Sequence, residues 1–286
     1  MNNLNLITTS SASSSMVPGL VSVVMPIFNA QDVVSDAITS VLCQSYSNLE
    51  LIICDDFSTD ESKSLVESFS KADSRVKLVI NTFGKGAAGA RNSCLQNACG
   101  QYIAFLDADD MWKIDKLEKQ IFYMKTHRIY FCYSYYDNLF PNGQRKIVKS
   151  PDRVNFKLMR FNNWVGCLTV VLDAAEFRDI NQPSLKKRND YAYWLKLLYG
   201  ADSSITGCVP ESLAVYRVSS GGLSSNKIHA LYYYVKCIRE FGRVRVEFLP
   251  IFILIYLAIL FIKKSSLLIY NKMISGKIFE KILRMN

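Results

Sequence analysis

The stretch Tyr102-Ile-Ala-Phe-Leu-Asp-Ala-Asp-Asp110 decides how this chain is organised. Its first five residues are largely apolar, which predicts a buried strand, and three carboxylates follow within the next four positions. A hydrophobic core cannot solvate ionised carboxylates, so the strand must end at a cleft or at solvent. The sequence therefore predicts a functional site at the carboxyl end of this strand.

The three carboxylates, Asp107, Asp109 and Asp110, admit two interpretations. Closely spaced carboxylates repel one another unless a cation lies between them, and a hard divalent ion held by one or two carboxylates and by substrate phosphates is a common arrangement. Alternatively, Asp109 or Asp110 caps the amphipathic helix that the spacing predicts over residues 112–121. The two roles are compatible, and both stay open at this point.

Length and composition bound the class of protein. A chain of 286 residues with 50% hydrophobic content can bury a sizeable core, in one large domain or two small ones. The eight cysteines are scattered without CxxC spacing, which favours reduced core residues of a cytoplasmic protein over a disulfide framework or a zinc site. Residues 1–15 are rich in Ser, Thr and Asn and lack the pattern of a signal peptide, so we expect a disordered leader over residues 1–18.

The net charge of +9 is unevenly distributed. Residues 1–110 carry 6 Lys and Arg against 12 Asp and Glu, whereas the rest of the chain carries 28 against 13. A basic second half fits nucleic acid, anionic lipid or phosphorylated acceptors. The chain contains no nucleic-acid-binding motif, so we expect no nucleic-acid partner.

Strands alternate with helices in the first part of the chain. This alternation predicts βαβ units and an α/β fold with a mainly parallel sheet, whose ligands bind at the carboxyl ends of the strands. Asp55 and Asp56 end the second strand, so they are expected at the same edge as the acids after the fourth. Strands are predicted over residues 20–27, 49–54, 76–80 and 102–106, and helices over residues 32–44, 60–72 and 87–98.

A glycine-rich turn offers an alternative function. Gly84-Lys-Gly-Ala-Ala-Gly89 is a literal GxGxxG between a predicted strand and a predicted helix, and Asp107 follows at the spacing of a ribose-binding acid. An NAD(P)-dependent oxidoreductase is therefore an alternative. Against it, the motif lies in the third strand-helix unit, and no second run of βαβ units follows Asp110. Three clustered carboxylates also suit a metal-bridged phosphate better than a ribose hydroxyl.

Four motifs together carry a resemblance to a known family. They resemble, in order and spacing, the successive motifs of inverting family-2 glycosyltransferases with the GT-A fold, over residues 20–225. The resemblance implies a Rossmann-like, mainly parallel sheet in a GT-A domain over residues 19–225. The motifs are Val23-Val-Met-Pro-Ile-Phe-Asn29, Ile53-Cys-Asp-Asp-Phe-Ser-Thr-Asp60, Gly89-Ala-Arg-Asn92 and Phe105-Leu-Asp-Ala-Asp-Asp-Met-Trp112.

The resemblance implies roles for these residues. Asp55 would contact the nucleotide base, with Asp56 beside it. Asp107 would lie near the ribose, and Asp109 would hold Mn²⁺ or Mg²⁺ on the diphosphate. The further residues expected to line the nucleotide-sugar pocket are Pro26, Phe28, Asn29, Arg91 and Asp110.

Two later segments are also similar to the family. Lys186-Lys-Arg-Asn-Asp-Tyr-Ala-Tyr-Trp-Leu-Lys-Leu-Leu198 resembles the family's Glu-Asp pair before an aromatic helix start, in which the Asp is the catalytic base. Asp190 keeps this acid, although Asn189 replaces the Glu; the alternative is that Asp190 only caps the helix. Val215-Tyr-Arg-Val-Ser-Ser-Gly-Gly-Leu-Ser224 resembles the segment that closes over the diphosphate, which makes Arg217 a candidate phosphate contact.

Aromatic segments lie between these motifs. Residues 129–148 are aromatic and rich in turn residues, which predicts a strand pair on the core, with a stacking surface for a sugar ring as the alternative. Residues 162–171 begin polar and continue as a strand. This pattern places Trp164 where an acceptor would pass.

The tail changes character after residue 225. Residues 248–262 are uninterrupted apolar residues, shorter than the roughly 20 that a spanning helix needs, with basic residues on both flanks. Tyr270, Ile274, Ile278 and Ile282 then share one face of a basic helix suited to anionic lipid. We expect residues 226–286 to be a helical region that associates with a membrane, peripherally or monotopically; the alternative is that the helices fold back onto the core.

These observations lead to one functional expectation. The chain is predicted to be a glycosyltransferase at the cytoplasmic face of the inner membrane, with a nucleotide-diphosphate sugar, here a UDP-sugar, as donor. The basic second half and the apolar tail favour a lipid-diphosphate-linked glycan acceptor, as in O-antigen or capsule assembly. A nucleotide-sugar-binding protein without turnover is the competing class. The presence of both a candidate base, Asp190, and a candidate metal acid, Asp109, favours the enzyme.

Overall fold

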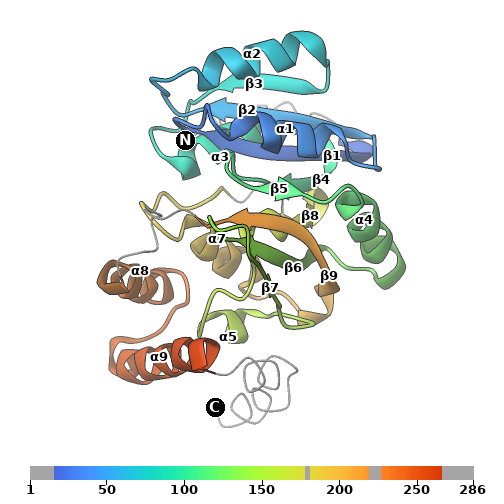
Figure 1. Cartoon of the computed structure of the whole chain (residues 1–286). Coiled ribbons are helices and arrows are strands. Elements are labelled where there is room, and N and C mark those ends of the chain that lie inside the picture. The colour runs from blue at the N-terminus through green and yellow to red at the C-terminus, as the bar shows by residue number, and fades with distance from the viewer. Residues whose placement is uncertain (1–15, 178–180, 219–226, 266–286) are drawn as a thin grey trace, which may run out of the picture.

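The first strands and helices lie where the sequence predicts them (Figure 1). The computed structural model describes residues 16–177, 181–218 and 227–265. Its first strand begins at Val17, so residues 17 and 18 belong to the sheet and not to the expected leader. The elements of this part are β1 (Val17–Ile27), α1 (Val34–Leu42), β2 (Leu49–Asp55), α2 (Ser62–Ala72), β3 (Val76–Ile80), α3 (Ala87–Gln96) and β4 (Gly100–Phe105).

Four parallel strands form the first part of the sheet, in the order β3-β2-β1-β4. Val24 of β1 lies beside both Ile52 of β2 and Phe105 of β4, so the carboxyl ends of these strands meet at one edge. The predicted α/β fold is confirmed. The polar residues that follow β1, β2 and β4 consequently gather where a parallel sheet binds its ligands.

The second part of the chain extends this sheet with mixed strand directions. β8 pairs antiparallel with β4 and β6, β9 runs parallel to β6, and β5 pairs antiparallel with β9. β7 pairs antiparallel with β6, which confirms the strand pair predicted within residues 129–148. The elements are β5 (Met111–Trp112), α4 (Lys116–His127), β6 (Phe131–Leu139), β7 (Arg145–Val148), α5 (Phe156–Met159), β8 (Val171–Asp173), α6 (Ala174–Phe177), α7 (Asn189–Leu198) and β9 (Thr206–Arg217).

The helix predicted over residues 112–121 begins later than expected. Met111 and Trp112 form β5 on β9, and α4 starts at Lys116 with Asp115 in the N-cap position. Neither Asp109 nor Asp110 caps this helix, so the capping interpretation is wrong. Pairing with β9 satisfies the backbone of Met111 and Trp112, which outweighs the helical spacing of the side chains.

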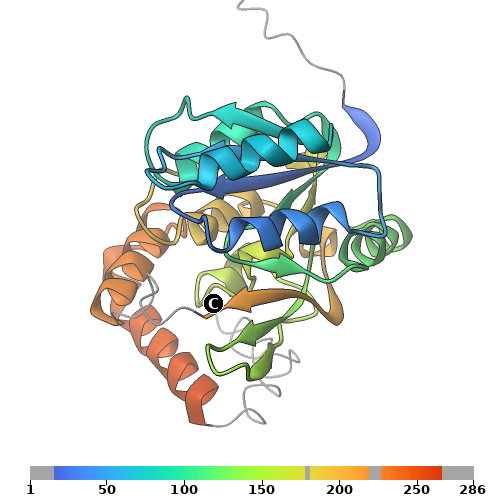
Figure 2. The same ribbon diagram turned by 45° about the horizontal axis from the view of Figure 1, so that its top comes forward.

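The two faces of the sheet form two separate cores. Side chains alternate along β1, so that Val24 packs in the core beneath α3 and α7, whereas Val23 and Met25 pack in the core beneath α1, α2 and α4. Figure 2 brings α1 and α2 in front of the strands. Helices thus cover both faces, and the carboxyl edge of the parallel strands stays open for a site.

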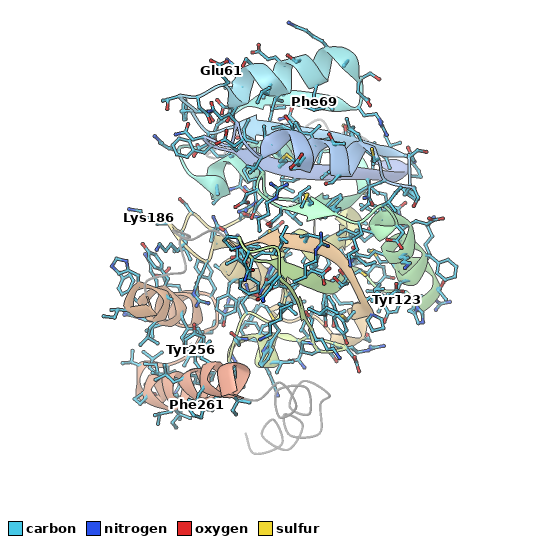
Figure 3. The ribbon with its side chains drawn as sticks, in the orientation of Figure 1. Glu61, Phe69, Tyr123, Lys186, Tyr256 and Phe261 are labelled. Atoms are coloured by element: carbon cyan, nitrogen blue, oxygen red, sulfur yellow. The ribbon has the colours of Figure 1, made fainter. Side chains whose placement is uncertain are left out.

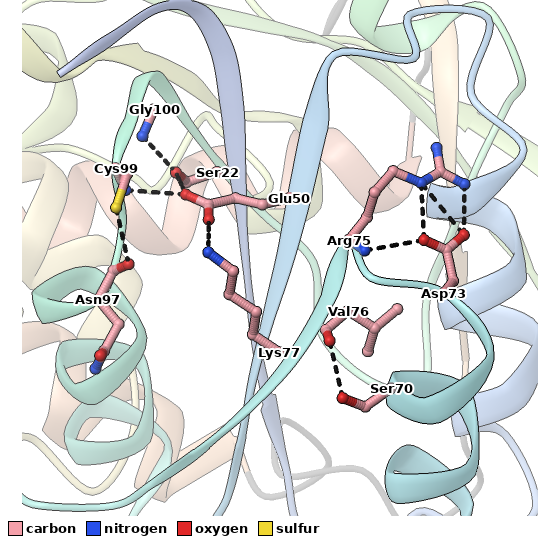
Figure 4. Close-up of polar contacts among 10 residues, drawn as sticks. All are labelled: Ser22, Glu50, Ser70, Asp73, Arg75, Val76, Lys77, Asn97, Cys99 and Gly100. Carbon is pink, nitrogen blue, oxygen red and sulfur yellow. Dashed lines mark hydrogen bonds and ion pairs between the residues drawn. The ribbon is translucent and has the colours of Figure 1, made fainter.

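A buried carboxylate joins the strands near their amino ends (Figure 4). Glu50 of β2 accepts hydrogen bonds from Ser22 Oγ at 2.5 Å and from the Cys99 backbone N–H at 2.9 Å, and it pairs with Lys77 Nζ at 2.7 Å. Burial alone would raise the pKa of Glu50, but the hydrogen bonds from Lys77, Ser22 and Cys99 outweigh burial and lower it. Contacts among β1, β2, β3 and the start of β4 therefore fix the relative positions of the parallel strands.

The C-terminal helices pack on the domain. α8 (Lys227–Glu240) and α9 (Leu249–Ser265) bury Tyr234 and Tyr256 in the same core as α7, and these two rings stack with centroids 4.0 Å apart. In residues 16–177, 181–218 and 227–265, no helix is both long enough and apolar enough to cross a membrane. The alternative that the C-terminal helices fold back onto the core is confirmed for the side of α9 that carries Phe252, Tyr256 and Ile259. The boundary expected at residue 226 and the basic helix predicted from Tyr270 to Ile282 lie outside the described residues.

Candidate active site

A cavity of about 800 Å³ lies at the carboxyl edge of the parallel strands. Its volume falls within the range of roughly 300–1,000 Å³ that is typical of ligand pockets. The turn after β1, the acids after β4, the loop before the 3-10 turn Cys167–Thr169 and the start of α7 all contribute to its wall. Of the residues predicted from the sequence, it brings together Pro26, Phe28, Asn29, Asp56, Arg91, Asp107, Asp109, Asp110, Trp164 and Asp190.

The turn after β1 supplies an aromatic ring. Phe28 lines the cavity with half of its surface exposed, and Lys85 Nζ lies 5.4 Å from the centroid of its ring. Asn29 adopts a positive φ of 47°, and its side-chain oxygen accepts the backbone N–H of Thr59 at 2.9 Å. The turn is therefore held in place, and its ring offers a face on which a planar base can stack.

The two acids at the end of β2 have different surroundings. Asp56 is buried and lines the cavity, where it accepts hydrogen bonds from Asn81 Nδ2 and from the Gly86 backbone N–H, both at 2.8 Å. Asp55 accepts the backbone N–H of Ser58 at 3.2 Å and is not part of the cavity wall. The resemblance gave the base contact to Asp55, but the structure places Asp56 at the cavity.

Arg91 of α3 links the acid-tipped strand to the start of α7. Its guanidinium pairs with Asp107 and donates a hydrogen bond to Asn189 Oδ1 at 3.2 Å. The side chain is almost fully buried, and a buried charge needs such partners. Asn189 Oδ1 also accepts the backbone N–H of Asp190 at 2.8 Å. The residue that replaces the family's Glu therefore connects Arg91 with the candidate base.

Asp190 lies in the first turn of α7 and lines the cavity. Its Oδ2 accepts a hydrogen bond from Asn163 Nδ2 at 3.0 Å. Arg188 holds the N-cap position of α7, so Asp190 is not the capping residue. Burial raises the pKa of the Asp190 carboxyl, while the backbone N–H of Tyr191 and the charge of Arg91 act in the opposite direction. A carboxylate in this setting is suited to accept a proton from a bound hydroxyl.

Asp109 and Asp110 differ in exposure. Asp110 is buried and accepts the backbone N–H of Arg217 at 3.1 Å, so it anchors the end of β9 as well as lining the cavity. Asp109 is exposed as a residue, although its carboxyl is partly shielded from solvent. That shielding and the charge of Asp107 raise the pKa of Asp109, and burial followed by the charge of Asp109 raises the pKa of Asp110. A bound cation would relieve this repulsion.

The carboxylates after β4 fit a metal ion whose remaining ligands come from the phosphates of a substrate and from water. In the part of the chain that the structure describes, no three His, Cys, Asp or Glu side chains are grouped so as to hold a metal ion alone. Mg²⁺ and Mn²⁺ do not need such a group, because one or two carboxylates with substrate phosphates and water can hold them. Asp109, the exposed acid of the set, is the residue that fits this role.

Two predicted site residues lie differently from expectation. The Arg217 guanidinium pairs with Asp36 of α1 at 2.5 Å, and Arg217 does not line the cavity. The segment after it, residues 219–224, lies outside the described residues. Trp164 lines the cavity but is only 5% exposed, and its indole N–H donates to the Leu158 carbonyl at 3.1 Å. It therefore shapes the wall and does not present an open ring face to an acceptor.

Sequence reasoning missed Asn163 and a basic part of the wall. Asn163 contacts Asp190 across 27 positions of sequence, and an Asn in a loop gives no pattern from which to predict such a contact. Lys149, Lys186 and Lys187 also line the cavity. The excess of basic residues in the second half was visible in the sequence, but their gathering at one cavity was not.

Comparison with known families identifies the family of this chain. The sequence profile described as Glycosyl transferase family 2 matches residues 22–178, more than half of the chain. The chain belongs to glycosyl transferase family 2. The resemblance found in the sequence motifs is confirmed, and the roles given to the acids at the cavity of this glycosyltransferase stay predictions.

Curated relatives agree with this assignment. The chain is 42% identical over 212 residues to the Escherichia coli protein named UDP-Glc:alpha-D-GlcNAc-diphosphoundecaprenol beta-1,3-glucosyltransferase WfgD, a match that covers 74% of this chain and 82% of that protein. It is 39% identical over 210 residues to the putative teichuronic acid biosynthesis glycosyltransferase TuaG of Bacillus subtilis, covering 73% and 82%.

Solved structures share the fold. The S. aureus TarS 1-349 structure in complex with UDP-GlcNAc superposes with a TM-score of 0.61 at 18% identity, over 83% of this chain and 71% of that chain. The mannosyltransferase PcManGT from Pyrobaculum calidifontis, in complex with GDP-Man and Mn2+, gives a TM-score of 0.60 at 16% identity, over 93% and 80%. The predicted GT-A fold is confirmed.

The glycine-rich turn has a structural role in this glycosyltransferase. Gly84 and Gly86 have φ values of 96° and 119°, and a Cβ on Gly89 would approach the Gly84 carbonyl oxygen to 1.9 Å. The Gly86 N–H, which a dinucleotide phosphate would need, donates to Asp56 instead. With the family established, the oxidoreductase alternative has no remaining support.

Proposed function

We propose that the chain is a metal-dependent, inverting hexosyltransferase that moves a sugar from a nucleotide-diphosphate sugar to a lipid-diphosphate-linked glycan. The supporting observation is the meeting of Asp190, a candidate base, and Asp109, a candidate metal acid, in one cavity. UDP-glucose and a GlcNAc-diphosphate lipid are the first substrates to test, because the name of the WfgD relative contains both.

Different residues of the chain have different roles in such a transfer. Phe28 offers a face for the nucleotide base. Asp190, held by Asn163 and by the link through Asn189 to Arg91, takes the proton of the attacking hydroxyl. Bound Mn²⁺ or Mg²⁺ would neutralise negative charge on the leaving diphosphate. One base implies one displacement at the anomeric carbon, and hence inversion.

The proposed function is tested by assaying transfer. Purified protein with Mn²⁺ or Mg²⁺ is incubated with UDP-glucose and other nucleotide sugars, with and without a GlcNAc-diphosphate lipid. We expect one nucleotide sugar to give a product whose formation requires the acceptor. Binding of a nucleotide sugar without transfer to any acceptor would instead identify a binding protein.

The acceptor's lipid implies work at the cytoplasmic membrane surface, and α9 offers an apolar face for it. Ile251, Leu254, Leu257 and Phe261 are exposed, while Phe252, Tyr256 and Ile259 on the other side of the helix are buried in the core. An exposed apolar row of this kind suits a membrane interface. Arg243 and Arg245 precede α9 in the chain and would supply positive charge for anionic headgroups.

Charged substitutions on this face should release the protein from membranes. We expect Leu254→Glu with Leu257→Glu to weaken binding to vesicles containing anionic lipid by roughly ten-fold or more, because the apolar side chains no longer enter the interface. Co-sedimentation measures the effect. Ile114→Glu with Phe122→Glu, at exposed apolar positions before and within α4, is the matched control and should bind normally. Equal binding of both variants, or release of the unmodified protein by salt alone, would contradict an embedded face.

A further inference from the structure

One part of the cavity wall is basic. Lys149, Lys186, Lys187 and Arg188 line the same cavity as Asp190, together with Tyr233 of α8. Lys149 and Lys186 are exposed, and Lys187 and Arg188 are half-buried. The transfer described above uses none of these four cations. A cavity that must also admit an acceptor therefore contains a group of positive charges without an assigned ligand.

The charges of Lys149 and Lys186 are not neutralised by neighbouring acids in the described parts of the chain. The ion pairs found there do not include either residue. Two acids at the same cavity have other partners, since Asp107 pairs with Arg91 and Asp190 accepts from Asn163. Lys149 and Lys186 are thus available to an anionic ligand.

Arg188 has a different part in this wall. Its guanidinium donates to the Tyr256 hydroxyl of α9 at 2.6 Å and lies 5.6 Å from the centroid of the same ring. This contact ties the segment that carries Lys186 and Lys187 to α9. In Figure 3, Lys186 and Tyr256 lie on the same side of the molecule, away from Tyr123 of α4. The segment that carries Lys186 and Lys187 and helix α9 therefore lie on one side of the protein.

Lys187 is close enough to the candidate base for one acceptor to reach both, and Lys149 and Lys186 line the same cavity. Three residues span at most about 11 Å at roughly 3.6 Å each, so the Cα atoms of Lys187 and Asp190 are no farther apart than that. In a lipid-diphosphate sugar, the diphosphate is bonded to the sugar ring whose hydroxyl attacks the donor. A site for that diphosphate must therefore lie about one sugar ring away from the base.

We propose that Lys149, Lys186 and Lys187 form a subsite for the diphosphate of the acceptor. This inference rests on the proposed function and adds the residues that recognise the acceptor. Ammonium groups bind phosphate oxygens as compact charges, and three of them match a dianionic diphosphate. The donor's diphosphate, by contrast, lies at Asp109. The lipid leaves the subsite toward α8 and α9, on the side that meets the membrane.

The test compares two soluble acceptors without any membrane. One is a GlcNAc-diphosphate joined to a short alkyl chain, and the other is an alkyl GlcNAc glycoside without the diphosphate. For Lys149→Gln, Lys186→Gln and Lys187→Gln combined, we expect kcat/KM for the diphosphate acceptor to fall on the order of 10²-fold, and each single change to cost roughly 5- to 10-fold. The KM for the donor and the slow transfer to the glycoside should not change.

A matched control removes the same charge elsewhere. Lys63, Lys71 and Lys125 are exposed on α2 and α4 and do not line the cavity, so Lys63→Gln, Lys71→Gln and Lys125→Gln combined should behave like the unmodified enzyme. A rise in the donor KM of the cavity variant would assign the lysines to the donor and overturn the proposal. Unchanged kinetics with soluble acceptor but weaker binding to anionic vesicles would assign them to lipid headgroups. Absence of transfer by the unmodified protein would instead reject the proposed function itself.

Discussion

Replacing Asp190 with Asn should lower kcat by roughly 10² to 10⁴ while the donor's affinity is kept, because the amide cannot accept the proton of the attacking hydroxyl. Steady-state kinetics and donor titration measure the two quantities. The fold should persist, since Asn has the same size and removes a charge whose burial raises the pKa of the acid. A helix cap predicts the opposite pattern, because Asn caps about as well as Asp. Asp115→Asn, at the N-cap position of α4 and outside the cavity, is the control and should stay fully active.

The pH profile gives this prediction a second readout. The base works when it is deprotonated, so the rate should fall as the pH drops through the pKa of Asp190. Because burial raises that pKa, the acid limb of kcat should lie above the value of roughly 3.9 that is ordinary for Asp. The limb should disappear from the residual activity of Asp190→Asn. A limb that survives the substitution would assign the base to another group.

Replacing Asp109 with Asn should reduce transfer by roughly 10²-fold or more, because the diphosphate then departs without the charge neutralisation that a metal ion provides. EDTA should abolish transfer by the unmodified enzyme, and Mn²⁺ or Mg²⁺ should restore it. Asp109 is exposed, so the thermal unfolding midpoint of the variant should stay close to that of the unmodified protein.

A control substitution at another exposed Asp distinguishes loss of metal binding from the general effect of removing one negative charge. Asp152 is also exposed but does not line the cavity, so Asp152→Asn should leave transfer and its metal dependence unchanged. Titration of Mn²⁺ in the presence of the nucleotide product should show weaker binding for Asp109→Asn alone. Full activity of the unmodified protein in EDTA would contradict the role given to Asp109.

The acid-tipped strand was predictable from sequence because an apolar run that favours burial is followed within a few residues by ionised carboxylates that must stay solvated. The structure places Asp107, Asp109 and Asp110 at the cavity for that reason. The choice between Asp55 and Asp56 was not predictable in the same way. Asp55 is the last residue of β2 and Asp56 follows it, so the two side chains have different surroundings, and the hydrophobic pattern does not indicate which one reaches the cavity.

Features set by tertiary contacts lay beyond the sequence pattern. Trp112 fits the helical period predicted over residues 112–121, but the pairing of Met111 and Trp112 with β9 makes both a strand. The contact between Asn163 and Asp190 joins a loop to a helix far along the chain, and no local spacing encodes it. The apolar run of α9 predicted a helix but not which face of the helix is buried. Both faces are apolar, so only the tertiary structure decides which one packs on the core.

In the proposed function, Asp190 drives a single displacement of the donor's diphosphate by a hydroxyl of the lipid-linked acceptor. NMR of the purified product tests it most directly, since the proton coupling at the new anomeric centre reports the configuration of the linkage. With an α-linked donor such as UDP-glucose, we expect a β-linked product whose formation is lost in Asp190→Asn. An α-linked product would require two displacements or another mechanism, and would contradict the account.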